Sequence, residues 1–160
     1  MGENQSYVLV LIETLQKKKD ILDKILSITL EQEAISKASV YDEEAMEKTL
    51  NQKEFQITRL NELDDGFQSV YGRVRIEMRE HMDQYKDEIR QMQDLIRQCT
   101  DLGNAIQVLE QRNRDRFSQI FRSKHGEYKM SKAKTAVASN YLKTMNNTKI
   151  MDAYFVDKKK

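Results

Sequence analysis

Proline is absent from all 160 residues of the chain, and this absence is the strongest constraint on the fold. Average usage would place proline at about 5% of positions. Because proline removes a backbone donor and clashes with the preceding turn, a chain without it can form long uninterrupted helices. Glycine occurs only five times, while good helix formers such as Glu, Lys, Gln and Leu are frequent. The sequence therefore predicts an all-α fold.

The spacing of apolar residues defines two long helices in the first half of the chain. Between residues 4 and 37 they recur at steps of three, four and seven, which is typical of an amphipathic helix. Either Ser39 or Asp42 can cap a second helix, which we expect to start near residue 42. Gly66 and Gly72 are weak points in this helix, where we expect a bend or a short interruption.

Charged residues break the apolar seam of the second helix at two places, Lys53 and Asp64. A strict coiled coil accepts such breaks only at a cost in stability. A turn near 79–83 would send the chain back into a third helix, whose seam from Tyr85 to Ile120 is the most regular. These stripes can be buried together in an elongated antiparallel three-helix bundle or hairpin.

The charge of the chain changes sign towards its C-terminus. Residues 1–64 hold eight Lys/Arg and thirteen Asp/Glu, whereas residues 122–160 hold ten and three. We therefore divide the chain into a helical body, residues 1–122, and a basic segment, residues 123–160. Within this segment, apolar residues every four positions predict a short fourth helix over 130–145, followed by a flexible tail.

Composition points to a cytoplasmic protein. One third of the residues are charged, and no apolar run approaches the ~20 residues that span a bilayer, so no direct membrane insertion is expected. The N-terminal residues show neither a basic region nor an apolar signal segment. Cys99 is the single cysteine, so no disulfide forms within the chain, and its place on the third seam predicts a small buried side chain.

Motifs of enzymatic chemistry are missing from the sequence. It has no glycine-rich phosphate loop, nucleophile elbow or HExxH zinc motif, and we expect no enzyme activity, cofactor or metal site. The two histidines, His81 and His125, lie in polar stretches and are expected to be solvated. The basic C-terminal segment lacks a recognition-helix motif, so contact with a partner protein is favoured over nucleic acid.

The order of several segments resembles the FlgN-like group of flagellar type III export chaperones. None of these segments is catalytic, and it is their combination at matching spacing that carries the resemblance. The family's mid-helix Leu-Asp-x-Gly-Phe signal is similar to Leu63-Asp64-Asp65-Gly66-Phe67. The other segments that resemble the family are KEFQI (53–57), IQVLE (106–110), YLKTMN (141–146) and FVDKK (155–159).

This resemblance implies a chaperone that binds the C-terminal amphipathic helices of hook–filament junction proteins in the cytoplasm. Such a protein prevents premature assembly and delivers its clients to the cytoplasmic domain of a membrane protein of the export gate. A helix-in-groove complex suits this role, because it covers the apolar stripe of the client. We expect a partly polar groove, since the client must later be released.

The client groove is expected on the third helix and the C-terminal segment. Ordinary bundle core is the alternative role for each of the client-binding candidates. The residues proposed to bind the client are Ile106, Leu109, Phe117, Ile120, Phe121, Tyr141, Leu142 and Met145, and those proposed to contact the export gate are Tyr154 and Phe155.

Two other hypotheses are compatible with the sequence. The first is a homodimeric coiled-coil scaffold, which would self-associate through the same stripes without any secreted client. The broken seam of the second helix argues against a long strict zipper. The second is an export chaperone for another flagellar cargo, the filament cap or flagellin, which would present a similar helical groove.

Overall fold

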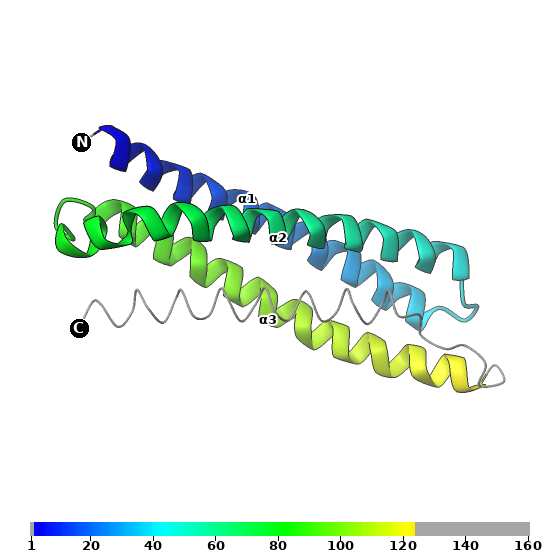
Figure 1. The fold of residues 1–160 in the computed structure, drawn as a ribbon. Coiled ribbons are helices and arrows are strands. Elements are labelled where there is room, and N and C mark those ends of the chain that lie inside the picture. The colour runs from blue at the N-terminus through cyan, green and yellow to red at the C-terminus, as the bar shows by residue number, and fades with distance from the viewer. Residues whose placement is uncertain (1, 124–160) are drawn as a thin grey trace.

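The structure of the protein, a computed structural model, describes residues 2–123, and all three of its elements are helices (Figure 1). Helix α1 spans Gly2–Lys37, α2 spans Glu43–Glu80 and α3 spans Lys86–Ser123. The predicted all-α fold with three long helices is confirmed for this part of the chain. The expected fourth helix and the basic segment from residue 124 onward lie outside the described residues.

Asp42 is the residue that caps α2. Its extended backbone leaves the helix, and its Oδ1 accepts a hydrogen bond from the backbone N of Ala45 at 3.0 Å. This bond satisfies one of the amide groups that have no partner in the first turn. Glu43 and Glu44 follow in that turn, where acidic side chains interact favourably with the helix dipole. Of the two caps considered from sequence, Asp42 is therefore the correct one.

The turn between α2 and α3 lies over residues 81–85, two residues later than expected. His81 ends α2, and its backbone N still donates to the Glu77 carbonyl oxygen at 3.0 Å. Tyr85, the first residue of the predicted third seam, is in the turn but is buried against the core. Its ring thus closes this end of the bundle before α3 begins.

Helix α2 is continuous through both of its glycines, so of the two expected outcomes, a bend or a short interruption, the interruption does not occur. A Cβ added at Gly66 or Gly72 would meet nothing within 4 Å. Both residues are exposed on the outer side of the helix. Neither glycine is required by close packing, and the seam residues on the opposite face hold this stretch helical.

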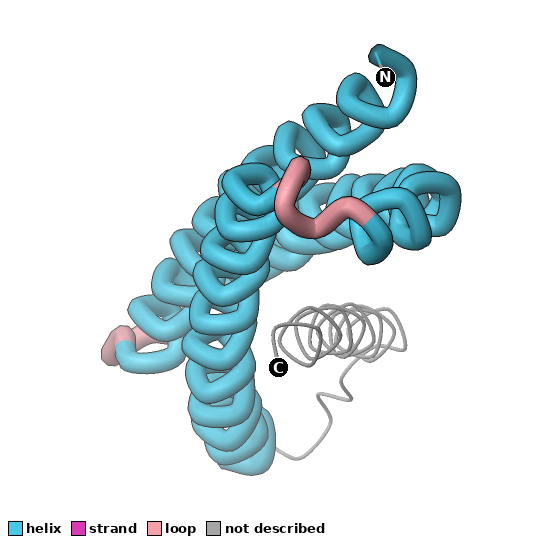
Figure 2. The backbone as a smooth tube through the Cα atoms, turned by 90° about the vertical axis from the view of Figure 1, so that its left-hand side faces the viewer, coloured by secondary structure: helices cyan, strands magenta, loops and turns pink. Residues whose placement is uncertain are grey.

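Helix α1 packs along both other helices, whereas no Cα atom of α2 lies within 8 Å of a Cα atom of α3. Figures 1 and 2 show α2 and α3 close together at their turn and spread apart at their opposite ends. At that far end lie the loop between α1 and α2 and the C-terminus of α3. The bundle therefore has a narrow end at the turn and a wide end opposite.

Apolar packing is concentrated at the narrow end. The side chains there come from all three helices and the turn, and fully burying one Leu, Ile or Met contributes roughly 1.5–3 kcal/mol. We call this group the apolar end; its buried members are Val8, Leu11, Ile12, Leu15, Phe67, Tyr71, Val74, Met78, Tyr85, Ile89, Met92 and Ile96.

A second group, the middle cluster, continues the core towards the wide end. Its members are Ile21, Leu22, Ile25, Ile57, Leu60, Cys99 and Ile106. Between the two groups, Lys18 of α1 donates to Oδ1 of Asp64 of α2 at 2.8 Å, with both side chains almost completely buried. Asp64, one of the two breaks in the predicted seam, is thus matched by a cation from another helix.

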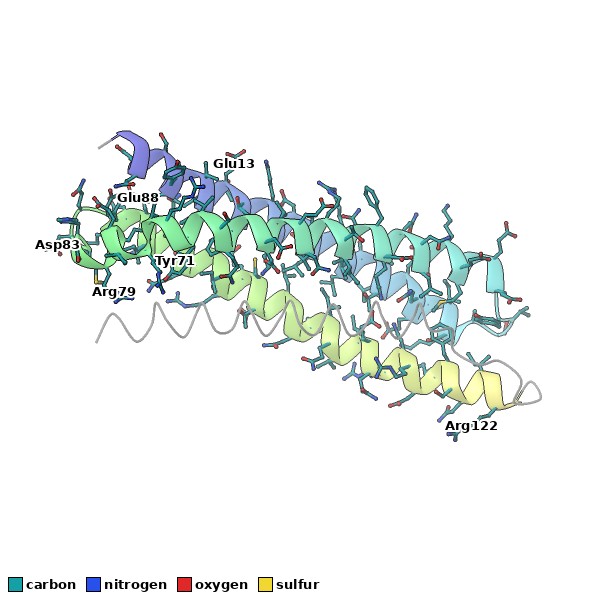
Figure 3. All side chains as sticks on the ribbon, viewed as in Figure 1. Glu13, Tyr71, Arg79, Asp83, Glu88 and Arg122 are labelled. Carbon is teal, nitrogen blue, oxygen red and sulfur yellow. The ribbon has the colours of Figure 1, made fainter. Side chains whose placement is uncertain are left out.

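Among residues 2–123, no helix is long and apolar enough to cross a membrane. Acidic and basic side chains cover the outer faces of the helices instead, as Figure 3 shows. Labelled examples are Asp83 and Glu88 at the narrow end and Arg122 near the far end of α3.

Candidate functional site: the wide end of the bundle

A small apolar group occupies the wide end, apart from the rest of the core. Only two of its side chains, Met46 and Phe117, are buried, and the others are half-buried. The Tyr41 and Phe117 rings meet edge to face with centroids 6.0 Å apart, which joins the α1–α2 loop to α3. We call this group the end cluster; it consists of Ile35, Tyr41, Met46, Leu50, Phe117 and Ile120.

Polar side chains separate the end cluster from the middle cluster. The central one is Lys53, the other break in the predicted seam, whose side chain is 4% exposed. Its Nζ donates to Oε1 of Gln32 on α1 and to Oε1 of Glu110 on α3. Lys53 therefore links α2 to both α1 and α3 in the half of the bundle nearer the wide end. We call the whole group the polar layer; it consists of Thr29, Gln32, Thr49, Lys53, Glu110 and Asn113.

Further hydrogen bonds complete the polar layer. Gln32 Nε2 donates to Oγ1 of Thr49 at 3.2 Å, and Thr49 in turn donates to a carbonyl oxygen of its own helix. Asn113 Nδ2 donates to the backbone oxygen of Thr29 at 3.0 Å. Buried polar groups are tolerated when they are paired in this way, but each bond contributes only about 1 kcal/mol net. The layer orients the helices without the strong stabilisation that apolar packing gives.

The two buried ion pairs are both affected by desolvation but differ in how exposed their carboxylates are. Desolvation lowers the pKa of Lys53, and the nearby Glu110 carboxylate opposes this shift. Desolvation likewise raises the pKa of Asp64, against the opposing effect of Lys18. The Asp64 side chain is 13% exposed, whereas that of Glu110 is 30% exposed, so water reaches the pair at the wide end more readily. The pair in the polar layer is accordingly the easier one to hydrate.

The candidates on α3 fall into two groups. Ile106 is completely buried in the middle cluster, so it serves as core, and Leu109 is half-buried. Phe117 and Ile120 both belong to the end cluster, on the side where α3 leaves the bundle. The structure therefore brings these last two residues together at one partly open surface.

The remaining candidates cannot be placed in the same way. The side chain of Phe121 is not among those described, although its backbone belongs to α3. The candidates from the basic segment lie outside the described residues; they are Tyr141, Leu142, Met145, Tyr154 and Phe155.

Sequence reasoning missed the part of the end cluster that comes from α1, the loop and α2. Met46 and Leu50 begin the apolar seam of α2, and their spacing predicts only that they face other helices. Tyr41 stands one residue before the Asp42 cap, a position where an apolar side chain often packs against the first turns of the helix. That pattern was the available signal for Tyr41. Ile35 had no comparable signal, because its place depends on how far α2 and α3 separate.

The end cluster is bordered by acidic residues on α2. Asp42, Glu43, Glu44 and Glu47 are all exposed on the first turns of this helix. Exposed charges of one sign next to an apolar surface favour partners of the opposite charge and speed their association. On its α2 side the wide end therefore combines a half-buried apolar surface with exposed acidic side chains, whereas the last turns of α3 carry Arg112, Arg114, Arg116 and Arg122.

The cysteine and the described histidine lie in the surroundings that their sequence positions predict. Cys99 is 2% exposed, as expected from its place on the seam, and burial raises the pKa of its thiol to about 11. A thiol that stays protonated at neutral pH is a poor nucleophile. His81 is exposed at the turn, as the sequence predicts.

Comparison with known proteins identifies the family of the chain. The family model described as "FlgN protein" matches residues 8–148, which is most of the chain and covers α2, α3 and all of α1 except its first residues. No curated protein matches the chain. No solved structure matches it either. The chain therefore belongs to the FlgN family, a family of chaperones for flagellar proteins, as the resemblance of its sequence predicts.

Proposed function

We propose that the protein is a cytoplasmic chaperone of flagellar type III export. In this role it binds the C-terminal amphipathic helices of hook–filament junction proteins and prevents their premature assembly. It then delivers them to the cytoplasmic domain of the export gate. Family membership supports the chaperone role. The choice of client and the delivery step are what the resemblance of the sequence to this family implies.

The observation that carries the proposal is the half-buried end cluster. An amphipathic helix presents apolar anchor residues at positions i, i+3, i+4 and i+7 along one face. A surface that binds this face needs a few apolar side chains with partial exposure. Tyr41, Leu50 and Ile120 have this character, because each packs on the cluster yet keeps part of its surface open. A client helix laid on them would bury their remaining apolar area.

Binding at this surface would be reversible. Only Met46 and Phe117 are buried here, so the apolar area available to a client is modest. The polar layer beneath it prevents the client from extending into a continuous apolar core. Affinity depends more on a few well-packed anchor residues than on total area, and aromatic residues such as Phe117 and Tyr41 commonly supply them. A chaperone that must release its client at the gate needs this balance.

We further propose that the basic C-terminal segment takes part in both interactions. Tyr141, Leu142 and Met145 recur on one side of its predicted helix and would cover the client from the other side. Tyr154 and Phe155, next to terminal lysines, would contact the export gate. These assignments rest on the sequence pattern and on the resemblance to the family.

Calorimetric titration with C-terminal helix peptides of hook–filament junction proteins tests the proposal. Saturable one-to-one binding to a junction peptide is expected, and a filament-cap peptide and a flagellin peptide serve as alternative cargoes. The variant Ile120→Glu should weaken binding about tenfold or more, since it places a charge in the apolar contact. The matched control is Val108→Glu, at a 52% exposed position on the same helix, which should leave the affinity unchanged.

Each other outcome of this titration has a clear meaning. Preferential binding of a cap or flagellin peptide would keep the chaperone role and change the client. No heat with any peptide, together with a stable dimer in sedimentation experiments, would refute the proposal in favour of a homodimeric scaffold. Equal loss of affinity in Ile120→Glu and Val108→Glu would show that the client does not bind specifically at the end cluster.

A further inference from the structure

Buried polar residues are unevenly distributed along the bundle. Eight polar or charged residues are buried among those described, and six of them lie at the level of the polar layer or beyond it. The two exceptions are Lys18, which is paired with Asp64, and Gln93. The six are Thr29, Gln32, Ser36, Thr49, Lys53 and Asn113. The wide end is therefore built mainly from polar contacts.

Lys53 makes this end costly to keep closed. Removing a cation from water carries a large desolvation cost, which a partner of good geometry offsets only in part. Its charged partner, Glu110, is itself partly exposed and stands on α3, the helix that diverges from α2. If α2 and α3 moved apart, Nζ of Lys53 and the Glu110 carboxylate would both regain water.

Little apolar area opposes such a movement. Among the described side chains beyond the polar layer, Met46 and Phe117 are the buried apolar members of the end cluster, compared with twelve at the apolar end. Segments with few buried apolar contacts open locally at a lower free energy than the core of the same protein. The segments concerned are the last turns of α1 from Thr29, the loop 38–42, the first turns of α2 to Lys53 and the last turns of α3 from Glu110.

We infer that the wide end opens as one unit while the apolar end stays folded, and that separation of the Lys53–Glu110 contact is the step that opens it. The opened state exposes the buried faces of Met46 and Phe117 and widens the surface available to a partner helix. The use of this opening by a client rests on the proposed function. The opening itself is a property of the free protein and can be measured without a client.

Hydrogen exchange of the full-length protein, followed by mass spectrometry or NMR, tests the inference directly. Amides at the wide end, in 29–36, 46–53 and 110–117, should exchange as one group, with rates at least about tenfold faster than amides in 8–15, 67–78 and 89–96. Addition of denaturant should accelerate the second group more strongly, because its exchange requires global unfolding. Equal protection at both ends, with the same denaturant dependence, would overturn the inference.

A pair of matched double variants identifies the opening step. The double variant Lys53→Met, Glu110→Leu replaces the Lys53–Glu110 ion pair by apolar side chains, which gain nothing from contact with water. Hydrogen exchange at the wide end should therefore slow by about tenfold. The control is Lys18→Met with Asp64→Leu, which makes the same change at the other buried pair. It should leave the difference between the two ends in place. If the control reduces the difference in exchange rate between the two ends as much as the first variant does, separation of the Lys53–Glu110 contact is not the step that opens the wide end.

The same variants separate this inference from the proposed function. If a junction peptide binds the natural protein, the Lys53→Met, Glu110→Leu variant should associate with it several-fold more slowly, because the opened state is rarer. If no peptide binds, the proposed function fails, while the exchange data still decide whether the wide end opens. Unchanged association by a variant whose exchange has slowed would show that the opening has no part in client binding.

Discussion

The two ends of the bundle are built from the same three helices but differ in how they are held together. At the narrow end, twelve buried apolar residues pack around the turn between α2 and α3. At the wide end, α2 and α3 separate, two buried apolar residues remain, and Lys53 joins the helices through polar contacts. The contrast indicates a division of labour, in which one end supplies stability and the other keeps a surface available for a partner.

Helix α1 explains how one chain can contain both arrangements. It is the helix that contacts each of the others, so its seam must serve two neighbours along its whole length. Near its start that seam holds Val8, Leu11 and Leu15, and near its end it holds Thr29 and Gln32. The change from apolar to hydroxyl and amide side chains occurs along a single uninterrupted helix. Stability and openness are therefore set by composition within a constant helical framework.

The largest expected effect comes from truncating a leucine at each end. Leu11→Ala at the apolar end removes a completely buried side chain and should lower the free energy of unfolding by about 4 kcal/mol. Leu50→Ala in the end cluster removes a half-buried side chain and should cost about 1 kcal/mol. Urea unfolding followed by circular dichroism measures both. Equal costs would mean that the two ends are equally well packed, contrary to the comparison.

The second prediction concerns the two buried ion pairs. Asp64→Leu leaves Lys18 buried without its carboxylate and should destabilise the fold by about 3 kcal/mol. Glu110→Leu leaves Lys53 bonded to Gln32, and local opening of the wide end would return its ammonium group to water, so the cost should be only about 1 kcal/mol. Urea denaturation at neutral pH gives both values. A larger loss for Glu110→Leu would show that the wide end is the more tightly closed of the two.

The sequence predicts the helices themselves better than it predicts which side chains pair between them. Absence of proline and the apolar spacing predict three long helices, because these signals act within a few residues along the chain. The same spacing marked Lys53 and Asp64 as defects in the α2 seam. Each is instead paired with a residue of another helix, and such pairing depends on how the helices align in space, which a one-dimensional pattern does not contain.

The candidate site was predictable only on α3. Phe117 and Ile120 were expected to bind a client, and they lie in the end cluster, but Ile106 from the same seam is ordinary core. The seam continues unchanged from core to surface, since its spacing carries no information on where α2 and α3 separate. That separation also determines which residues of α1 and the loop, such as Ile35 and Tyr41, remain half-buried.

Alkaline pH should affect the two ends in opposite directions. Burial raises the pKa of Tyr71 at the apolar end from 10.0 to about 12, although Arg75 and Arg79 favour the phenolate. The folded state retains a proton that the unfolded state releases, so this contribution is complete below pH 10 and is lost as pH rises towards 12. Desolvation lowers the pKa of Lys53 below 10.5. For this group the unfolded state binds the extra proton, so stability is gained as pH rises towards 10.5.

Two variants separate these contributions. Tyr71→Phe should reduce the loss of stability between pH 10 and 12 by about 1 kcal/mol, less than the full value of the pKa shift because the arginines and solvent stabilise part of the charge. Lys53→Met should remove the gain on the approach to pH 10.5. Urea unfolding at a series of pH values measures both slopes. A Tyr71→Phe profile that coincides with that of the natural protein would contradict the assignment.

The smallest predicted effect tests whether the wide end is held by its helix cap. Asp42→Ala removes the acceptor for the Ala45 amide and should cost about 1 kcal/mol or less, whereas Ser39→Ala, three residues earlier in the loop, should cost nothing measurable. Because the wide end is already weak, the loss should appear as faster hydrogen exchange in 43–53 while 67–78 keeps its protection. If Asp42→Ala instead accelerates exchange at both ends equally, the cap stabilises the whole bundle, and the two ends fold and unfold as one cooperative unit.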